Sequence, residues 1–596
     1  MLPTHAIVGA AIPADTPHAV SVSLPTWRAN VGYEEGQEWV MSKMKTGYPR
    51  FYIHKSIQKL VQSILQKFGQ PDEDAMLFPS PGVAKQCKQF IKQRSKTIPA
   101  PNVRVIELVY NKSKNPKTPK DSETPIWSDL CAVLFPAEEF KCAKEFWQHS
   151  GDGVSSRRAE FCQREFEEGS LVEKSLAAEL EDNNPTPPLA PKGPKRYSRL
   201  PRVDAKVHSQ SDLNGEIGED SSTYVEERFG RNLDVAFIEN AKLAIRRRIA
   251  GTLKSNLAPN DALEQSDEGG RLEGGFSEND VYLHPSGMSA IFNTHRFLMS
   301  ALGYKKSVSY GFPYIDTLKI LQKFGPGCYF YGNGSQEDLD DLQAKCESGE
   351  EILALFCEFP SNPLLKAPNL VRIRELADKY NFAVVIDETV GNFLNVNVLP
   401  YADVVVSSLT KVFSGDANVM GGSSVLNPKG RYYQQLKQTL NTEFEDNYWG
   451  EDALFLERNS RDFVSRIARI NKNAETISDL LRQHPRVKEV YYPKYSPTKP
   501  YYDNCRCENG GYGGLLSVTF YSREDAIAVF DTMEISKGPS LGTNFTLASP
   551  YTLLAHYGEL DWAAQFGVAS DLIRISVGLE ETDELVDILN RALAVL

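Results

Sequence analysis

Apolar residues in the second half of the chain occur in two patterns, short continuous runs and helix-like spacings. Three continuous runs each predict a buried strand: 351–359 (EILALFCEF), 382–386 (FAVVI) and 403–407 (DVVVS). Asn369 can cap a helix between the first two runs, and the apolar face of that helix would be formed by Ile373, Leu376, Ala377 and Tyr380. Buried strands joined through a helix indicate an α/β fold with a mostly parallel sheet covered by helices.

Polar tracts divide the chain into parts. Residues 111–124 are polar and lack periodicity, and 183–223 hold a Pro-rich run followed by an acidic, Ser- and Gly-containing stretch. Such segments bury too little apolar surface to offset the entropy of ordering, which favours loops and linkers. The sequence therefore predicts four parts: an N-terminal extension (1–182), a linker (183–223), a large domain (224–455) and a smaller C-terminal α+β domain (456–596).

Composition and charge narrow the classes of function. The 596 residues include 66 Lys+Arg and 78 Asp+Glu, a net charge of −12, which argues against a nucleic-acid binder. No run of about 18 apolar residues predicts a membrane span. The nine cysteines are scattered, and only Cys505 and Cys507 lie close together, which is weak as a metal motif. We expect a protein of the cytoplasm, with neither nucleic acid, membrane nor metal as partner.

The segment that carries most chemical information is Ser408-Leu-Thr-Lys411, directly after the third apolar run. One interpretation is an ordinary surface lysine. A second is the S-x-x-K motif of acyl-serine enzymes, whose K-T-G partner occurs only upstream, at 45–47. A third is a lysine that holds pyridoxal phosphate as a Schiff base, with Ser408 and Thr410 as phosphate ligands.

The third interpretation needs three further groups, and the sequence offers each of them. Asp387 ends the second strand and can pair with a pyridine nitrogen, which keeps the ring an electron sink. Gly287 and Met288 open a helix pattern behind Ser286, where backbone N–H groups and the helix dipole favour a phosphate. Tyr314 precedes another helix and can stack on the ring.

Eight strings extend this pattern: SGMSAI, EFPSNPLL, VVIDET, SSLTK, GGSSVLNP, HPRVKEVYYP, SLGTNF and LIRISVGLE. In this order, from about residue 224 to the end, the chain resembles the Cys/Met-metabolism family of pyridoxal-phosphate enzymes. The resemblance implies the fold type I of pyridoxal-phosphate transferases, which is aspartate-aminotransferase-like. The large domain would then bind the cofactor.

The resemblance also implies roles for individual residues. Lys411 would carry the cofactor and move protons, and Tyr314 would stack on the ring and assist in proton removal. Asp387 would pair with the ring nitrogen and Asn362 would contact the phenolic oxygen. The phosphate would be bound by Gly287, Met288, Ser408 and Thr410. The substrate carboxylate would be bound by Arg574, with Ser540 beside it.

The family further implies a homodimer or homotetramer, because a neighbouring subunit supplies a Tyr and an Arg to the phosphate. Tyr224 and Arg228 are the candidates in the matching region, although their spacing is stretched. Tyr48 and Arg50 keep the spacing better but lie in the extension. Both pairs are open at this point.

The activity implied by the resemblance is a γ-replacement that joins L-cysteine to an O-acyl-L-homoserine, acetyl or succinyl, in trans-sulfuration and methionine biosynthesis. Two activities with the same cofactor are alternatives, a γ-lyase and a sulfhydrylase that takes another acceptor. An alternative of another class is a catalytically weak homologue that acts as a regulatory scaffold. Retention of Lys411, Asp387, Tyr314 and Arg574 argues against the scaffold, since a scaffold needs none of them.

Overall fold

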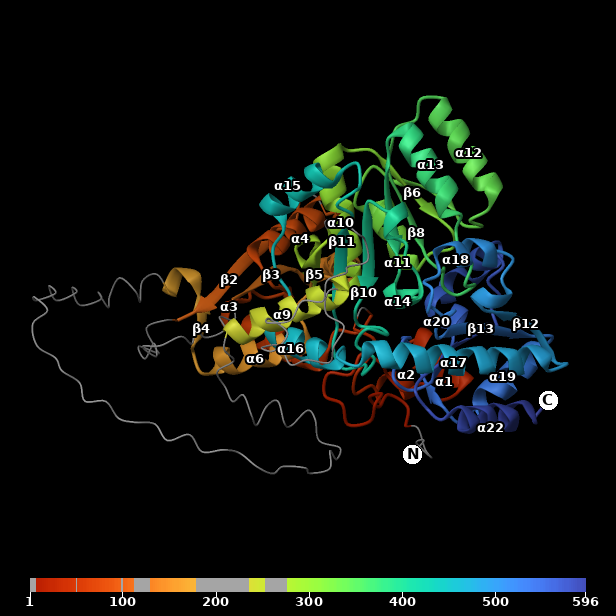
Figure 1. Cartoon of the computed structure of the whole chain (residues 1–596). Coiled ribbons are helices and arrows are strands. Elements are labelled where there is room, and N and C mark those ends of the chain that lie inside the picture. The colour runs from red at the N-terminus through yellow and green to blue at the C-terminus, as the bar shows by residue number, and fades with distance from the viewer. Residues whose placement is uncertain (1–6, 50, 98–99, 112–128, 178–234, 252–275) are drawn as a thin grey trace, which may run out of the picture.

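A computed structural model describes residues 7–49, 51–97, 100–111, 129–177, 235–251 and 276–596 (Figure 1). The predicted linker at 183–223 lies outside the described residues, as do 112–124 of the first polar tract. The described residues form three β-sheets, of four, seven and five strands. Among the helices that the structure describes, none combines the length and the apolar character that a bilayer crossing requires.

The seven-stranded sheet is the centre of the molecule and has the order β5-β11-β10-β9-β8-β6-β7. Its strands are β5 (Val281–His284), β6 (Lys306–Tyr310), β7 (Cys328–Tyr331), β8 (Ile352–Glu358), β9 (Ala383–Asp387), β10 (Val404–Ser408) and β11 (Gly422–Leu426). The pairings from β10 through β9, β8 and β6 to β7 are parallel, and β11 pairs antiparallel with both β10 and β5. The predicted strands at 351–359, 382–386 and 403–407 are confirmed as β8, β9 and β10, and so is the mostly parallel α/β sheet.

Helices cover both faces of this sheet, which explains why its strands are continuously apolar. Ala354 and Phe356 face one core cluster, while Leu355 and Cys357 of the same strand face another. The helices packed about the sheet are α9 (Val235–Ala250), α10 (Gly287–Leu302), α11 (Ile315–Lys323), α12 (Gln336–Glu347), α13 (Leu370–Tyr380), α15 (Tyr433–Glu443) and α16 (Gly450–Asn459). The predicted cap of α13 is confirmed, because the Asn369 side chain accepts a hydrogen bond from Arg372 N.

An antiparallel four-stranded sheet forms a further layer from the N-terminal part, in the order β1-β3-β2-β4. Its strands are β1 (Glu73–Phe78), β2 (Arg104–Tyr110), β3 (Leu130–Pro136) and β4 (Leu171–Glu173), with helices α3 (Lys55–Phe68), α4 (Pro81–Arg94), α5 (Phe140–Ser150) and α6 (Ser156–Glu167). Phe78 and Phe146 from this layer share one core cluster with Ile291 and Phe292 of α10. The N-terminal part therefore packs directly on the helix that opens at Gly287.

The C-terminal part holds the third sheet, in the order β12-β13-β16-β15-β14. Its strands are β12 (Val487–Tyr491), β13 (Leu515–Phe520), β14 (Ser536–Lys537), β15 (Leu547–Pro550) and β16 (Ile573–Ser576), with helices α17 (Phe463–Gln483), α18 (Lys499–Cys505), α19 (Arg523–Thr532), α20 (Tyr551–His556), α21 (Leu560–Ala564) and α22 (Thr582–Leu593). The strands and helices of this part confirm the smaller α+β unit that the sequence predicts here. Its predicted first residue, 456, falls inside α16, and the division of the chain at this point stays a prediction.

The beginning of the described chain packs against this C-terminal part. Helices α1 (Trp27–Glu34) and α2 (Glu38–Met41), red in Figure 1, lie beside the blue C-terminal helices. The Trp27 ring meets Phe530 of α19 edge-on at 5.9 Å between centroids. Leu24 N donates to Lys537 O at 2.9 Å. This packing attaches the first described segment of the chain to the C-terminal part.

Candidate active site

One cavity opens at the carboxyl ends of β8, β9 and β10, the place where ligands bind in sheets of this kind. Ten of the predicted site residues line it: Gly287, Met288, Tyr314, Asn362, Asp387, Ser408, Thr410, Lys411, Ser540 and Arg574. The structure therefore brings together residues that are spread over almost 290 positions. Their individual roles stay predictions. Tyr224, Arg228 and Arg50 lie outside the described residues.

Lys411 is buried in the turn that follows β10, with only 8 % of its surface exposed. Its amine donates hydrogen bonds to Tyr48 Oη at 2.8 Å and to Ser540 Oγ at 3.0 Å. Gly542 lies against the same turn, where an added Cβ would come within 2.5 Å of Val412 N. Lysine amines usually lie in water, so a lysine buried at a cavity wall is a candidate for covalent chemistry.

The start of α10 forms the part of the cavity that suits a phosphate. Ser286 caps this 16-residue helix, and its side chain accepts a hydrogen bond from Ser289 N. A Cβ at Gly287 would lie 2.6 Å from Ser408 Cβ, so only glycine allows the helix to approach β10 here. The Thr410 hydroxyl exchanges hydrogen bonds with the backbone of Gly421, which leaves it less free for a ligand than Ser408.

Asp387 ends β9 deep in the wall of the cavity. Burial raises the pKa of this carboxyl, against hydrogen bonds from the side chain and backbone of Thr389 that lower it. A positively charged ring nitrogen beside Asp387 would offset the cost of burying the carboxylate. The environment of Asp387 therefore fits a pyridinium group.

A second buried carboxyl, Glu358, organises the neighbouring wall. It lies beside Asp387 in the sheet register, and burial, together with the charge of Asp387, raises its pKa well above the usual range. One oxygen accepts from Tyr314 N at 2.5 Å and the other accepts from Asn362 N at 3.0 Å. Glu358 thus fixes the backbone of two residues predicted to contact the cofactor.

Arg574 in β16 closes the cavity from the C-terminal part and is only 6 % exposed. Its guanidinium donates to Asn362 Oδ1 at 3.1 Å and to Ser540 O at 2.7 Å, and it lies over the Tyr551 ring. It makes no ion pair with any described residue, and burial lowers its pKa. A buried cation without an acidic partner suits the carboxylate of a substrate.

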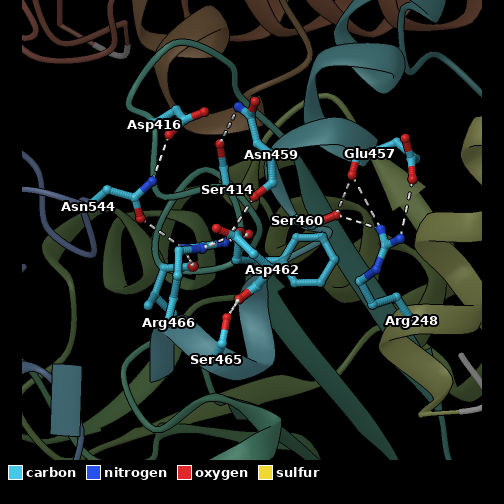
Figure 2. A network of polar contacts seen from close by, with 12 residues as sticks. Arg248, Ser414, Asp416, Glu457, Asn459, Ser460, Asp462, Ser465, Arg466 and Asn544 are labelled. Carbon is cyan, nitrogen blue, oxygen red and sulfur yellow. Dashed lines mark hydrogen bonds and ion pairs between the residues drawn. The ribbon is translucent and has the colours of Figure 1, made fainter. Parts of the chain in front are cut away.

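The turn that carries Lys411 is supported by a polar network outside the cavity (Figure 2). Arg466 of α17 is buried, and its guanidinium donates to Val412 O and Phe413 O, both at 2.9 Å. It also donates to Asn544 Oδ1 at 3.0 Å and to Asp462 Oδ1 at 2.7 Å. The network ties the residues after Lys411 to both α17 and the loop after Gly542.

Residues of the N-terminal part hold the first turns of α10 in place. Ser286 Oγ donates to Gly151 O at 3.0 Å, and Ser289 Oγ donates to Asp152. Asn293 Nδ2 also donates to Asp152, at 3.1 Å. The extension therefore contacts the first turn of the helix predicted to bind the phosphate.

The sequence analysis gives no role to Glu358 and Asp152, and it leaves the role of Tyr48 open. Glu358 closes a predicted buried strand, and a carboxylate at the end of such a strand is the signal that could have drawn attention to it. Tyr48 lines the cavity from the extension, and its Tyr-x-Arg spacing was the available signal. Asp152 supports α10 through contacts 137 and 141 residues apart in sequence, which no local pattern indicates.

The cavity has the groups that pyridoxal phosphate requires. They are a buried amine at Lys411, the carboxyl of Asp387 at the end of β9, a helix start at Gly287 and an aromatic residue at Tyr314. No cluster of His, Cys, Asp and Glu suited to a metal ion occurs among the described residues. These groups point to pyridoxal-phosphate chemistry.

Comparisons with known proteins agree with this assignment. Residues 56–155 match the model of the fungal trans-sulfuration enzyme N-terminal domain. The chain is 52 % identical to a cystathionine gamma-synthase of Neurospora crassa (99 % of this chain, 98 % of the relative). It is 40 % identical to the cystathionine gamma-synthase of Saccharomyces cerevisiae (98 % of each chain). An alanine racemase of Aspergillus violaceofuscus is 32 % identical (96 % of this chain, 93 % of the relative). Residues 260–594 match the model of the Cys/Met metabolism PLP-dependent enzymes, and the chain belongs to this family.

Proposed function

We propose that the chain joins L-cysteine to an O-acyl-L-homoserine, acetyl or succinyl, and releases L-cystathionine, as a pyridoxal-phosphate-dependent cystathionine gamma-synthase. The observation that carries this proposal is one cavity lined by Lys411, Asp387 and Arg574, which bring an amine, a carboxyl and a buried guanidinium to one site. The two relatives of the same name, 52 % and 40 % identical over nearly the whole chain, supply the substrate class.

The residues of the cavity divide the work of a γ-replacement. Pyridoxal phosphate, when bound, supplies a sink for the electrons left at the substrate α-carbon. Arg574 binds the α-carboxylate and orients the α-hydrogen towards Lys411. The Lys411 amine takes the α-proton and assists in later proton transfers, a role worth roughly 10²–10⁴-fold in rate. In the overall exchange, the bond between the substrate γ-carbon and the ester oxygen breaks, and a bond between the γ-carbon and the cysteine sulfur forms. The acyl group leaves as its carboxylate and the thiol gives up its proton.

We also propose that the protein is a homodimer or homotetramer of the cytoplasm. The family resemblance supports an oligomer, and the nine cysteines are scattered along the sequence, too sparsely for a disulfide scaffold, which favours a reducing compartment. Size-exclusion chromatography with light scattering tests the first proposal: two or four chains support it, and a monomer contradicts it. Imaging of a fluorescent fusion tests the second, since signal confined to an organelle would contradict it.

The test of the activity is the full-length holoprotein with O-acetyl- or O-succinylhomoserine, with and without cysteine. We expect cystathionine only when cysteine is present. Oxobutyrate without an acceptor would instead identify a γ-lyase, and a faster reaction with sulfide would identify a sulfhydrylase. A protein that holds no cofactor and forms no product would be the scaffold. Racemisation of alanine, the reaction in the name of one relative, is measured in parallel.

A further inference from the structure

The corner that follows α5 in the N-terminal extension packs against the first turn of α10. Gly151 ends α5 with a φ of +65°, and Asp152 follows it in a buried position. A Cβ added at Gly151 would lie 2.5 Å from Ser286 Oγ and 2.7 Å from Ser289 N. Glycine is therefore required here both by the left-handed backbone and by the close approach to α10.

Asp152 binds α10 through two side chains of that helix. The Ser289 hydroxyl donates to Asp152 Oδ1, and Asn293 Nδ2 donates to Asp152 Oδ2 at 3.1 Å. The amide of Asn293 also donates to Ser289 O at 3.0 Å. One buried carboxyl of the extension thus holds two successive turns of α10 in register.

These contacts leave the backbone donors at the start of α10 available. The Ser286 hydroxyl donates to Gly151 O at 3.0 Å and accepts from Ser289 N at 3.1 Å. The first N–H groups of a helix have no partner within the helix, and in α10 these belong to Gly287 and Met288. The extension therefore fixes the turn that presents these donors to the cavity without competing for them.

The same end of α5 is anchored to the rest of the molecule on both sides of this corner. The Phe146 ring meets Phe292 of α10 edge-on, with 6.1 Å between centroids. Gln148 Nε2 donates to Asp316 Oδ1 in the first turn of α11 at 3.1 Å. The corner at Gly151 is thus held against α10 by packing as well as by hydrogen bonds.

We infer that Asp152 is a positioning residue for the cofactor phosphate, which it serves by fixing the first turn of α10 through Ser289 and Asn293. The inference deepens the proposed function, since it rests on the start of α10 as the phosphate site. Several N–H groups bind a phosphate together at a helix start, so a shift of this turn weakens all of these hydrogen bonds at once. The extension thereby acts on the site without contact with the phosphate.

The role of Asp152 is tested with Asp152→Ala in the full-length chain, and Glu139→Ala is the matched control. Glu139 is another buried carboxyl of the extension, and it accepts hydrogen bonds from Ser95 and Thr97 of the extension itself. The apoproteins are titrated with pyridoxal phosphate and with pyridoxal, which lacks the phosphate. A general loss of stability would weaken the binding of both compounds alike, whereas a shifted phosphate site weakens only the first.

We expect Asp152→Ala to raise the Kd for pyridoxal phosphate by about 10-fold or more and to leave the Kd for pyridoxal at the wild-type value. Glu139→Ala should leave both values unchanged. Phosphorus NMR of the holoproteins should show the resonance of Asp152→Ala displaced towards that of free pyridoxal phosphate. An unchanged Kd for pyridoxal phosphate, or an equal loss of affinity for both compounds, would overturn the inference.

A pair of glycine variants tests the same contact and keeps the buried carboxyl, in case Asp152→Ala does not fold. Gly151→Ala places a methyl group against Ser286 and Ser289, whereas Gly36→Ala has the same φ of +65° and nothing within 4 Å of the added Cβ. We expect only Gly151→Ala to lose affinity for pyridoxal phosphate relative to pyridoxal. Equal affinities in the two variants would contradict the inference.

A failure of this inference can be separated from a failure of the proposed function. If the wild-type apoprotein binds pyridoxal as tightly as pyridoxal phosphate, the start of α10 is not a phosphate site and the cofactor assignment fails. If the wild type prefers pyridoxal phosphate and Asp152→Ala keeps that preference, only the role of Asp152 is refuted. Neither result depends on which substrate the protein converts.

Discussion

Arg574 is a buried guanidinium whose described partners are neutral, Asn362 Oδ1 and Ser540 O. A substrate carboxylate would add charged hydrogen bonds worth about 1.5–3 kcal/mol. Arg574→Ala should therefore raise KM by about 10- to 100-fold, with a smaller effect on kcat. Steady-state kinetics with O-acylhomoserine measure this. Arg469→Ala, which removes an exposed arginine paired with Glu581, is the control, and an equal KM for both variants would exclude Arg574 from substrate binding.

Ser540 is held in a strained conformation between Lys411 and Arg574. Its φ is +109°, a region that residues other than glycine rarely occupy, at a cost of about 1–3 kcal/mol. Among the two variants that lack the hydroxyl, Ser540→Gly should be more stable than Ser540→Ala by about 1 kcal/mol.

Thermal unfolding of the two apoproteins checks this order. The same pair of substitutions at Ser517, in the extended strand β13, should rank the other way, because glycine weakens a strand. Equal melting temperatures for Ser540→Gly and Ser540→Ala would contradict the claim that the backbone at residue 540 is strained.

At the scale of elements, Arg466 holds the turn after Lys411 to α17 (Figure 2). Arg466→Ala leaves the carbonyls of Val412 and Phe413 without their donor, at about 1–3 kcal/mol for each buried group. We expect a loss of several kcal/mol in stability, together with weaker retention of the cofactor on dialysis. Ser465→Ala, which removes an exposed hydroxyl of the same network, should change neither. Full stability and cofactor retention in Arg466→Ala would show that the network does not support the site.

The junction between the extension and α10 should depend on pH. Burial raises the pKa of Asp152 to about 6, against hydrogen bonds from Ser289 and Asn293. The unfolded chain gives up this proton near pH 3.8, so the folded state binds it more tightly. The contribution of Asp152 to stability is greatest below the unfolded pKa and is lost as pH rises through about 6.

Asp152→Asn removes this titration and gives the matched comparison. The difference in unfolding free energy, wild type minus variant, should fall by about 2 kcal/mol between pH 4.5 and pH 7. Urea unfolding of both proteins at these two pH values measures it. A difference that does not vary with pH would mean that the Asp152 carboxyl titrates normally.

At the scale of the whole molecule, the sequence predicts those features whose signal lies within a few neighbouring residues. The strand that ends at Asp387 and the turn at Lys411 are marked by continuous apolar runs followed by polar residues, so they could be located locally. Ser540 and Arg574 required the family resemblance, because nothing in their neighbourhood marks a cavity.

The rest depends on contacts that span the chain. Tyr48 and Lys411 are 363 residues apart in sequence, and the packing of the extension on the C-terminal part decides that they meet. The Tyr-x-Arg spacing marks Tyr48 as a candidate, but it does not show that Tyr48 contacts Lys411. Glu358 was read as part of an apolar strand, and only its contacts with Tyr314 and Asn362 show what its carboxyl does.

The account depends above all on a single covalent link to pyridoxal phosphate at Lys411. Borohydride reduction of the holoprotein makes that link permanent, and peptide mass spectrometry then locates it. We predict one pyridoxyl group, on the peptide that contains Lys411, and none in Lys411→Ala. A pyridoxyl group on another lysine, or on no peptide of the wild-type protein, would contradict the account.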